Sequence, residues 1–316
     1  MRLMCRTSTI IARVAVVVML VAAGPASAGS THERFEFSSY SEVDALFNKL
    51  NYTPETWQQG VRAVPRVYLT EIPARWRDSV APNISVETKK RIFFRALAPL
   101  VLRANELIAQ ERERLKRISE DRALMQRERS WLQALAERYK VGGDSSTPLG
   151  DSDLEELLVR VDVIPTSLVL AQAAEESGWG TSRFAAQGNA LFGQWTWGGA
   201  GIQPEQQRQS LGDYKIAAFD SPQESVSAYA HNLNTHSAYA PLRQRRASLR
   251  ADGQPLTGRA LVNTLTSYSE RGEEYVESLQ AIIRVNKLAP ADDAYLLDMT
   301  PIDLVPVGAG VVPASD

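Results

Sequence analysis

The segment that most restricts how this chain can fold is PTSLVLAQAAEESGWG, residues 165–180. On a helix, with about 100° between successive residues, its apolar side chains cover almost the whole surface. A helix that is apolar on nearly every side must be buried, so the rest of the fold has to enclose it. Pro165 suits the start of such a helix and Gly178 its end.

The polar side chains of this helix form one stripe, made of Gln172, Glu175 and Glu176. Burial, the negative end of the helix dipole and an adjacent acid all raise the pKa of a carboxyl. A carboxyl that stays protonated near neutral pH is what general acid catalysis needs. From these residues alone, a catalytic acid and an ordinary solvated helix end are both open.

Composition bounds the class of protein. The chain has 316 residues, of which 44% are hydrophobic, and a formal net charge of −2. These values are typical of one or two globular domains, and no excess of basic residues favours binding to nucleic acid.

The N-terminus has the pattern of a secretory signal peptide, residues 1–28, with a small-residue cleavage site that ends at Ala28. The alternative is an uncleaved anchor helix, but the apolar run is short for a membrane span. The only cysteine, Cys5, lies in this segment. We therefore expect a mature protein that is exported, most simply to the periplasm, with no disulfide, no cysteine nucleophile and no stable membrane span.

Residues 29–141 are predicted to form a helical N-terminal region. A short helix is expected at about residues 41–50, irregular structure over 51–83, and helical periodicity over 84–141, kinked or divided at Pro99. The later part is a long charged helix with a narrow apolar stripe. That stripe either docks a protein partner or packs on its own domain, and its irregular heptads favour packing. It consists of Leu107, Ile108, Leu115, Ile118, Leu124, Leu132 and Leu135.

Turn-forming residues at 142–150 predict a linker, and residues 151–290 predict a compact, mostly helical domain. Glycine turns and alternating patterns between residues 189 and 221 predict a small β-hairpin lobe within it. Residues 291–316 lack periodicity, so we expect a loose C-terminal tail. The predicted fold class is thus mainly α with a small β lobe.

The segment SLVLAQAAEESGWGTSRFAAQGNALFGQW, residues 167–195, resembles the signature of bacterial endo-β-N-acetylglucosaminidases. This family includes the catalytic domain of the flagellar peptidoglycan hydrolase. FDSPQESVSAY (219–229) and SYSERGEEYVESLQAII (267–283) resemble further elements of the family. VPRVYLTEIP (64–73) and NLNTHSAYAPLR (232–243) make the chain similar to its Bax-type branch.

The resemblance implies a lysozyme-like α+β catalytic domain with a cleft between its helices and its β lobe. It implies that Glu176 is the catalytic acid and that Tyr268 lies near it, where a phenol can orient water or an acetamido group. It implies no cofactor. The candidate second acids are Glu205 and Asp213, but the surrounding sequence is unlike the usual acidic element of the family, so assistance by the sugar's N-acetyl group stays open.

Other residues of the motif are candidates for contact with the glycan. Aromatic faces stack on the apolar faces of sugar rings, although Trp179 suits the core or the floor of the cleft equally well. Glu224 belongs to a capping box after Ser221 and is expected to be structural. His231 and His236 lack the spacing of a zinc site, so no metal is expected. The predicted substrate-binding residues are Trp179, Asn189, Phe192, Trp195 and Trp197.

The expected activity is that of an exported glycosidase that cleaves β-1,4 bonds at N-acetylglucosamine in peptidoglycan or a related glycan. One alternative is a lytic transglycosylase, which works with a single glutamate. Another is a non-catalytic protein that binds the wall or acts as a scaffold.

Overall fold

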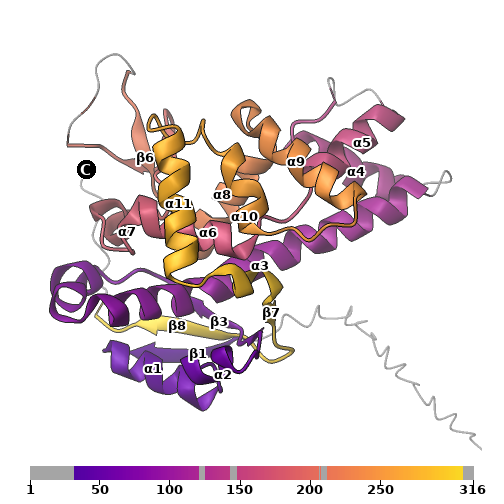
Figure 1. Cartoon of the computed structure of the whole chain (residues 1–316). Helices are drawn as coiled ribbons and strands as arrows, with labels where there is room; N and C mark the ends of the chain where they lie inside the picture. Colours follow the sequence, from indigo (N-terminus) through magenta and orange to yellow (C-terminus); the bar gives the residue numbers. More distant parts are fainter. Residues whose placement is uncertain (1–31, 121–124, 143–147, 206, 208–211, 309–316) are drawn as a thin grey trace, which may run out of the picture. The chain divides into compact units, whose positions relative to one another are not determined.

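The computed structural model describes residues 32–120, 125–142, 148–205, 207 and 212–308. These residues belong to one compact unit, residues 31–316; the predicted signal peptide lies outside the described residues. Helices dominate and the strands are few and short (Figure 1), which confirms the mainly α class with a small β lobe. Within the described part of the chain, no helix is both long and apolar enough to cross a membrane.

The described elements are α-helices, short helical turns and short strands. The α-helices are α1 (Tyr40–Lys49), α2 (Pro54–Gln58), α3 (Val86–Glu120), α4 (Gln126–Arg138), α5 (Asp151–Arg160), α6 (Thr166–Ser177), α7 (Arg183–Gly188), α8 (Pro222–Thr235), α9 (Ala240–Ala251), α10 (Gly258–Leu261) and α11 (Glu273–Val285). The short helical turns are η1 (Trp76–Val80), η2 (Ala81–Asn83), η4 (Ser237–Tyr239), η5 (Val262–Thr264) and η6 (Ala289–Asp293). The strands are β1 (Glu33–Phe37), β2 (Ala63–Val64), β3 (Val67–Leu69), β4 (Trp195–Thr196), β5 (Gly201–Ile202), β6 (Lys215–Ala217), β7 (Tyr295–Leu296) and β8 (Ile302–Pro306).

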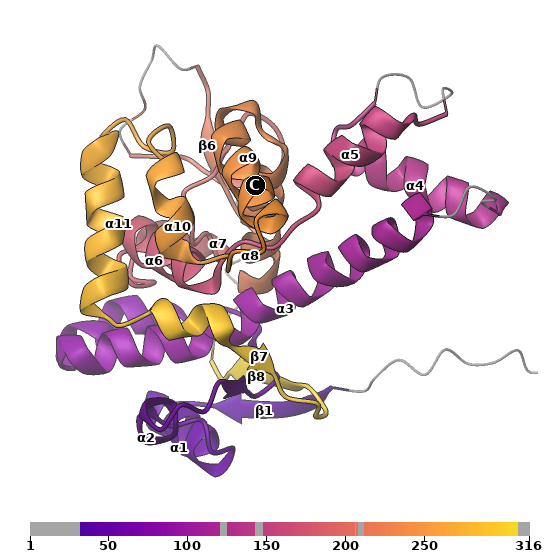
Figure 2. The same cartoon turned by 45° about the vertical axis from the view of Figure 1, so that its right-hand side comes forward.

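Helix α6 is the apolar segment singled out in the sequence, and it lies at the centre of the helical part. It contacts α3, α10, α11 and η6, and Figure 2 shows these elements around it. All its residues from Thr166 to Ala174 are buried. The prediction that this helix must be enclosed is therefore confirmed, and its rigid surroundings fix the direction of the side chains at its C-terminal end.

The start of α6 is held by close contacts. A Cβ on Gly258, the first residue of α10, would lie 2.9 Å from the backbone nitrogen of Leu168, so only glycine permits this approach. The Asp292 carboxylate accepts hydrogen bonds from the Ser167 N–H at 2.8 Å, the Ser167 hydroxyl at 2.8 Å and the Gly258 N–H at 2.9 Å. These bonds tie η6 and α10 to the first turn of α6.

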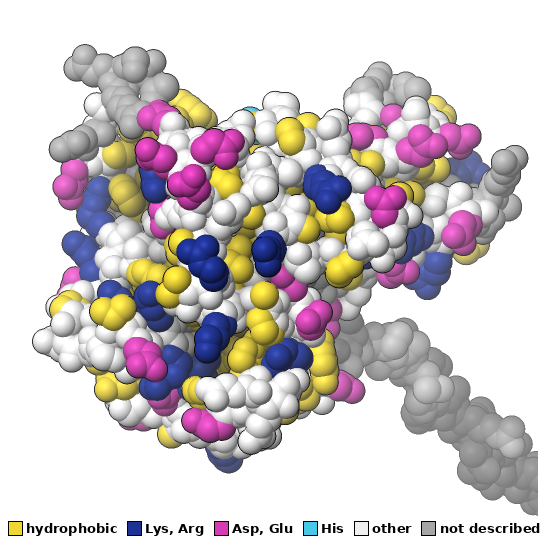
Figure 3. Space-filling view, viewed as in Figure 1, with side chains coloured by type: hydrophobic (Ala, Val, Ile, Leu, Met, Phe, Trp, Pro, Cys, Tyr) yellow, Lys and Arg dark blue, Asp and Glu magenta, His cyan; other side chains and the backbone are white. Residues whose placement is uncertain are grey.

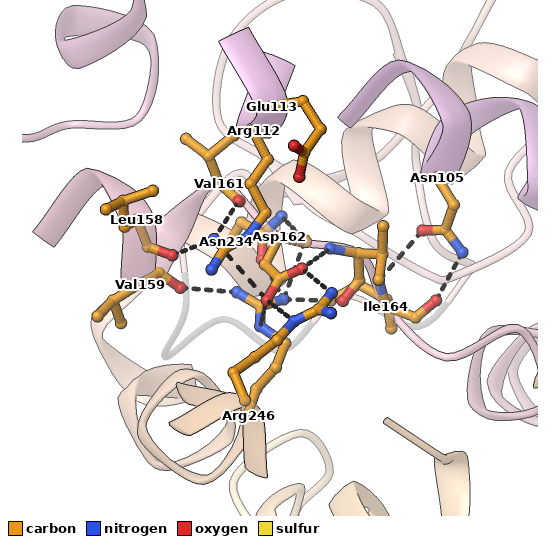
Figure 4. Close-up of polar contacts among 12 residues, drawn as sticks. Asn105, Arg112, Glu113, Leu158, Val159, Val161, Asp162, Ile164, Asn234 and Arg246 are labelled. Carbon is orange, nitrogen blue, oxygen red and sulfur yellow. Dashed lines mark hydrogen bonds and ion pairs between the residues drawn. The ribbon is translucent and has the colours of Figure 1, made fainter. Parts of the chain in front are cut away.

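The turn that leads into α6 is fastened by a buried polar network (Figure 4). Asp162 is 2% exposed, and Arg250 of α9 donates to its two carboxylate oxygens at 3.1 and 2.7 Å. The fully buried Arg246 donates to backbone carbonyls of the same turn. Asn105 of α3 bonds both the N–H and the carbonyl of Ile164. The chain therefore enters α6 in one fixed position between α3 and α9.

The C-terminal segment differs from the loose tail that was expected over 291–316. Strand β8 forms the middle of a parallel sheet in the order β1-β8-β3, with Phe35 opposite Leu304 and Leu69 opposite the same residue. Ile302 and Leu304 are buried in it. Hydrophobic periodicity did not predict this strand, because it is only five residues long and its partners lie more than 200 residues away in the sequence. Residues 309–316 lie outside the described part.

The N-terminal region is also more ordered than expected, because α2, β2, β3, η1 and η2 occupy residues 51–83. Strand β2 pairs in parallel with β7, so both ends of the chain contribute to the same small sheets. Helix α3 contacts β3, β7, α6 and α8. The expected division at 142–150 therefore does not separate two compact units, because α3 joins the N-terminal elements to the helices around α6.

The charged helical region is a long helix followed by a shorter one. Helix α3 continues through Pro99 and is not divided there. The apolar stripe is covered by the chain itself: Leu115, Ile118, Leu132 and Leu135 are buried in one core. Packing within the domain, the favoured alternative, accounts for these residues. Of the rest of the stripe, Ile108 is buried in the same core, Leu107 is 41% exposed and Leu124 lies outside the described residues.

The predicted β-hairpin lobe is a three-stranded antiparallel sheet in the order β4-β6-β5. The pattern between residues 189 and 221 predicted a hairpin, but the central strand β6 comes last in the sequence, and local alternation carries no signal for that order. The lobe stands beside α7, which contacts β5.

Candidate active site

The C-terminal end of α6 turns sharply directly after Glu176. Gly178, Trp179 and Gly180 have φ values of 56°, 64° and 75°, a left-handed conformation that favours glycine. The buried Ser177 hydroxyl accepts a hydrogen bond from the Gly180 N–H at 2.8 Å and donates to a carbonyl one turn earlier. The Ser-Gly-Trp-Gly motif thus ends the helix at a fixed point, with Glu176 on its last turn.

Glu176 is half-buried, and its pKa is raised above the ordinary value for a glutamate. Burial is the largest cause, and the charge of Glu175 adds to it. A hydrogen bond with the Tyr275 hydroxyl and the charge of Arg271 act in the opposite direction without cancelling the rise. The direction agrees with the prediction made from the sequence, and it keeps the carboxyl protonated at higher pH than an ordinary glutamate.

Glu175 meets different surroundings although it is the adjacent residue. Its Oε1 atom lies 2.7 Å from Nη1 of Arg271, in an ion pair at the surface. Consecutive residues on a helix point about 100° apart, so the two carboxyls face different neighbours. Among the described residues, Glu175 is therefore the carboxyl of this helix end that forms an ion pair, whereas Glu176 forms none.

Four tyrosines surround Glu176, and we call them the tyrosine cluster: Tyr229, Tyr239, Tyr268 and Tyr275. Burial raises the pKa of each hydroxyl, and the charge of Glu176 raises it further, so all four lie within electrostatic reach of the acid. The rings of Tyr268 and Tyr275 are stacked, with centroids 5.5 Å apart and planes 2° from parallel. The acid therefore lies within electrostatic reach of four phenol groups.

Gln172 holds two of these tyrosines in place. Its amide nitrogen donates to the Tyr275 hydroxyl at 2.9 Å, and its amide oxygen accepts a hydrogen bond from the Tyr229 hydroxyl. Gln172 is completely buried one turn before Glu176. The polar stripe of α6 is thus a structural glutamine followed by the candidate acid.

Tyr268, the predicted site tyrosine, donates from its hydroxyl to the Phe192 carbonyl at 3.1 Å. This bond links the segment before α11 to the Asn-Ala-Leu-Phe-Gly motif. A role in orienting water or an acetamido group stays a prediction. Tyr275 was missed as a site residue, because seven residues from Tyr268 in a predicted helix is also the ordinary spacing of core residues.

The Asn-Ala-Leu-Phe-Gly motif brings its glycine next to the acid. A Cβ on Gly193 would lie 3.7 Å from Oε2 of Glu176, and the φ of Gly193 is 60°. The Leu191 N–H donates to the Ser225 hydroxyl at 3.1 Å, which fixes this motif against α8. The chain between α7 and β4 therefore passes beside Glu176.

Asn189 and Phe192 are used by the fold itself, contrary to the predicted contact with substrate. The Asn189 side chain accepts from the Ile72 N–H at 2.9 Å and donates to the Phe219 carbonyl at 3.0 Å. The Phe192 ring is 2% exposed and stacks on Tyr229 with centroids 4.0 Å apart. Their side chains position the motif, because both amide atoms of Asn189 and the ring of Phe192 already have partners.

Of the three tryptophans predicted to bind substrate, one packs against the core and two are exposed. Trp179 packs edge-on against Phe93 and Phe94 of α3, as a core residue would. Trp195 and Trp197 are 44% and 66% exposed on the small sheet, with ring centroids 6.1 Å apart. The two exposed rings remain candidates for stacking on sugars, whereas Trp179 fastens the helix end.

The two candidate second acids also lie on the β lobe. The side chain of Glu205 is 84% exposed and pairs with Arg183 at 3.4 Å. Asp213 is exposed. The charges that shift the pKa of Glu176 are those of Glu175 and Arg271.

Three smaller predictions concern structural residues. The Glu224 side chain accepts from the Asp220 N–H at 2.9 Å and its N–H donates to the Ser221 hydroxyl, which confirms the cap of α8. His231 stacks edge-on against Tyr139, and His236 accepts from the Ala238 N–H. Within the described ranges, no three histidine, cysteine or acidic side chains gather as a metal site requires.

A half-buried glutamate with a raised pKa, on the last turn of a rigid helix, is suited to protonating a glycosidic oxygen. The family comparison agrees with this chemistry, and the chain is a glycosidase. Residues 152–288 match the family model of mannosyl-glycoprotein endo-beta-N-acetylglucosaminidase. The chain belongs to this family, which implies a glycan as substrate.

Two known proteins are similar to this chain. It is 38% identical to the Protein bax of Escherichia coli (strain K12) over 200 residues, which cover 63% of this chain and 70% of that protein. A solved structure, that of the catalytic domain of the autolysin Auto from Listeria monocytogenes, superposes on 68% of this chain and 93% of its own with a TM-score of 0.37. The sequence identity between the two is 17%.

Proposed function

We propose that this glycosidase is exported and cleaves β-1,4 bonds at N-acetylglucosamine in peptidoglycan, with Glu176 as the general acid. The observation that carries the proposal is the raised pKa of Glu176 beside the tyrosine cluster, while Glu175 is held by Arg271. Membership of the family supports cleavage at N-acetylglucosamine. The resemblance of residues 167–195 to peptidoglycan hydrolases supports peptidoglycan as the substrate.

In the proposed reaction, the Glu176 carboxyl donates its proton to the glycosidic oxygen as the bond from that oxygen to the anomeric carbon breaks. Positive charge develops on the sugar ring, and the ionised carboxylate that remains stabilises it. The Tyr275 hydroxyl, bonded to Glu176 and held by Gln172, keeps the carboxyl in place.

The second group of the reaction is proposed to come from the substrate. Glu205 is exposed and paired with Arg183, and Asp213 is exposed on the lobe. Attack by the oxygen of the sugar's own acetamido group needs no second carboxylate from the protein. Water then opens the resulting ring and leaves a reducing N-acetylglucosamine end.

The exposure of Glu205 and Asp213 also favours a second candidate, lytic transglycosylation, because that reaction too works with one glutamate. There the hydroxyl on carbon 6 of the same sugar attacks its own anomeric carbon in place of water as the leaving sugar departs, and the product is a 1,6-anhydro end. The two reactions differ in product mass by one water, so the released fragments separate them.

The test is digestion of purified peptidoglycan by the mature protein, with mass spectrometry of the fragments. Glu176→Gln should lower the rate by about 10²- to 10⁴-fold, because Gln keeps the shape but has no proton to donate. Glu175→Gln, the matched control on the same turn, should retain most of the activity. Full activity of Glu176→Gln would contradict its assignment.

Anhydro ends would assign the chain to the transglycosylases, and reducing N-acetylglucosamine ends to the proposed activity. An absence of fragments from the unaltered protein would contradict peptidoglycan as the substrate. Export is tested separately: the mass of the secreted protein should correspond to a chain that begins at Gly29.

A further inference from the structure

A groove away from Glu176 has the charge and the shape of a binding site. It lies between α2 and the turn that joins α11 to η6, and has a volume of about 580 Å³. We call it the α2–α11 groove. The residues that define it here are Trp57, Arg62, Arg91, Phe94, Arg95 and Lys287.

Four cationic side chains line the groove, and none of its lining residues is acidic. They come from separate elements: Arg91 and Arg95 from α3, Arg62 from the turn before β2, and Lys287 from the turn after α11. Figure 3 shows Lys and Arg side chains gathered on this face around exposed apolar surface. The positive charge is thus spread along the groove rather than placed at one point.

The fold neutralises only part of this charge. Asp44 of α1 pairs with Arg95 at 2.7 Å and with Arg91 at 3.2 Å, so a single carboxylate serves two guanidinium groups. The Nε atoms of both arginines are buried without a hydrogen-bond partner in the described part of the protein. A second acid, the exposed Glu55, interacts electrostatically with both arginines. Four cations therefore face two carboxylates.

The remaining two cations are available at the rim. Arg62 lies over the Trp57 ring at 4.6 Å, and both of its hydrogen bonds to described residues use Nη1, which leaves Nε and Nη2 free to donate. Lys287 is exposed and forms no ion pair with the described residues. Its φ of 53° places a lysine where glycine or asparagine is more usual, at the mouth of the groove.

We infer that the α2–α11 groove binds a peptide that carries several carboxylates. A single compact anion such as phosphate would use one cluster of donors, whereas these cations come from three separate segments and line a groove that also has aromatic and apolar side chains. An extended acidic peptide offers alternating carboxylates and apolar side chains that match both. In peptidoglycan, such peptides are attached to the glycan strand.

The groove and the candidate active site share one helix. Leu170 of α6 lies at the groove, six residues before Glu176, or roughly 9 Å along the helix axis. That separation is comparable with a few residues of extended peptide. Only the identification of the peptide with the peptidoglycan stem rests on the proposed function. The binding of acidic peptides stands on the groove alone.

The first experiment measures binding of capped peptides of alternating alanine and glutamate, and of alanine and glutamine, to the mature protein by calorimetry. Lys287→Gln should weaken binding of the glutamate peptide about two- to five-fold, and Lys287→Glu about ten-fold. Lys140→Gln is the matched control, because Lys140 is also exposed and has a φ of 57°. It should leave the affinity unchanged, as should Glu176→Gln.

Three outcomes would overturn the inference: equal binding of the two peptides, no effect of either Lys287 substitution, or competition by inorganic phosphate at the same affinity as the peptide. None of them bears on Glu176. In a second experiment, Lys287→Glu should raise KM for intact peptidoglycan without changing kcat, and leave KM for glycan stripped of its peptides unchanged. A rise with both substrates would contradict a peptide site.

Discussion

At the scale of single residues, Glu175 and Glu176 show how neighbours in sequence acquire different chemistry. The first is paired with Arg271 at the surface, and the second is half-buried beside Tyr275. The sequence placed both carboxyls at one helix end and predicted a raised pKa. Which of them is paired with Arg271 and which lies beside Tyr275 depended on contacts with segments that are distant in the sequence.

The charges around Glu176 predict opposite shifts in the pH dependence of hydrolysis. A general acid must be protonated, so activity falls as pH rises through the pKa of Glu176. Glu175→Gln removes a charge that raises this pKa, and should move the alkaline limb to lower pH. Arg271→Gln removes a charge that lowers it, and should move the limb to higher pH. Shifts of kcat against pH in the same direction for both variants would contradict the role of Glu176.

The raised pKa of Glu176 also predicts a cost in stability. The folded state binds the proton more tightly than the unfolded state, so the free energy of unfolding falls as pH rises from about the ordinary value of 4.5 to the folded pKa. At pH 7, Glu176→Gln should therefore be more stable than the unaltered protein. Urea unfolding checks this, and the gain should disappear at pH 4, where the carboxyl is protonated in the folded state.

At the scale of elements, α6 is the helix whose position and burial the sequence predicted best. Its boundaries follow from Pro165 and Gly178, and its burial from its apolar surface. The helix ends, the cap of α8 and the internal packing of the charged helices were all predictable from local patterns. The order of the strands in the β lobe was not, because pairing depends on contacts between distant segments.

The approach of α10 to α6 predicts a strong effect of one methyl group. Gly258→Ala would bring a Cβ within 2.9 Å of the Leu168 nitrogen and against Ser167, so one of the two helices must move. We expect a loss of about 1–3 kcal/mol in the free energy of unfolding, measured by urea denaturation. Gly198→Ala is the control, since a Cβ there meets nothing within 4 Å. Equal stability of the two variants would show that the contact is not tight.

At the scale of the molecule, the two ends of the described chain meet in one sheet. Strand β8 lies between β1 and β3, and helix α3 carries this sheet on one side and α6 on the other. The N-terminal region is therefore part of the support of the candidate active site. Its helix α2 lines the α2–α11 groove, for which no local motif gave a signal.

The position of β8 predicts that the C-terminal segment is needed for stability. Leu304 is 1% exposed, and Leu304→Ala should cost about 2–5 kcal/mol of unfolding free energy. Val307→Ala, three residues later and 46% exposed, should change it by less than about 0.5 kcal/mol. Thermal unfolding of both variants checks the pair. Similar melting temperatures would mean that β8 is dispensable, as a loose tail would be.

The sequence by itself determined the family, the buried helix α6, the sharp turn after Glu176 and the mainly α class, because each depends on residues close together in the chain. Only the tertiary structure decided the pairing of β1 with β8, the tyrosine cluster around the acid, the structural use of Asn189 and Phe192, and the α2–α11 groove. The reason is physical: burial, hydrogen-bond partners and the field at a carboxyl are set by segments that meet in space, and hydrophobic periodicity carries no record of which segments those are.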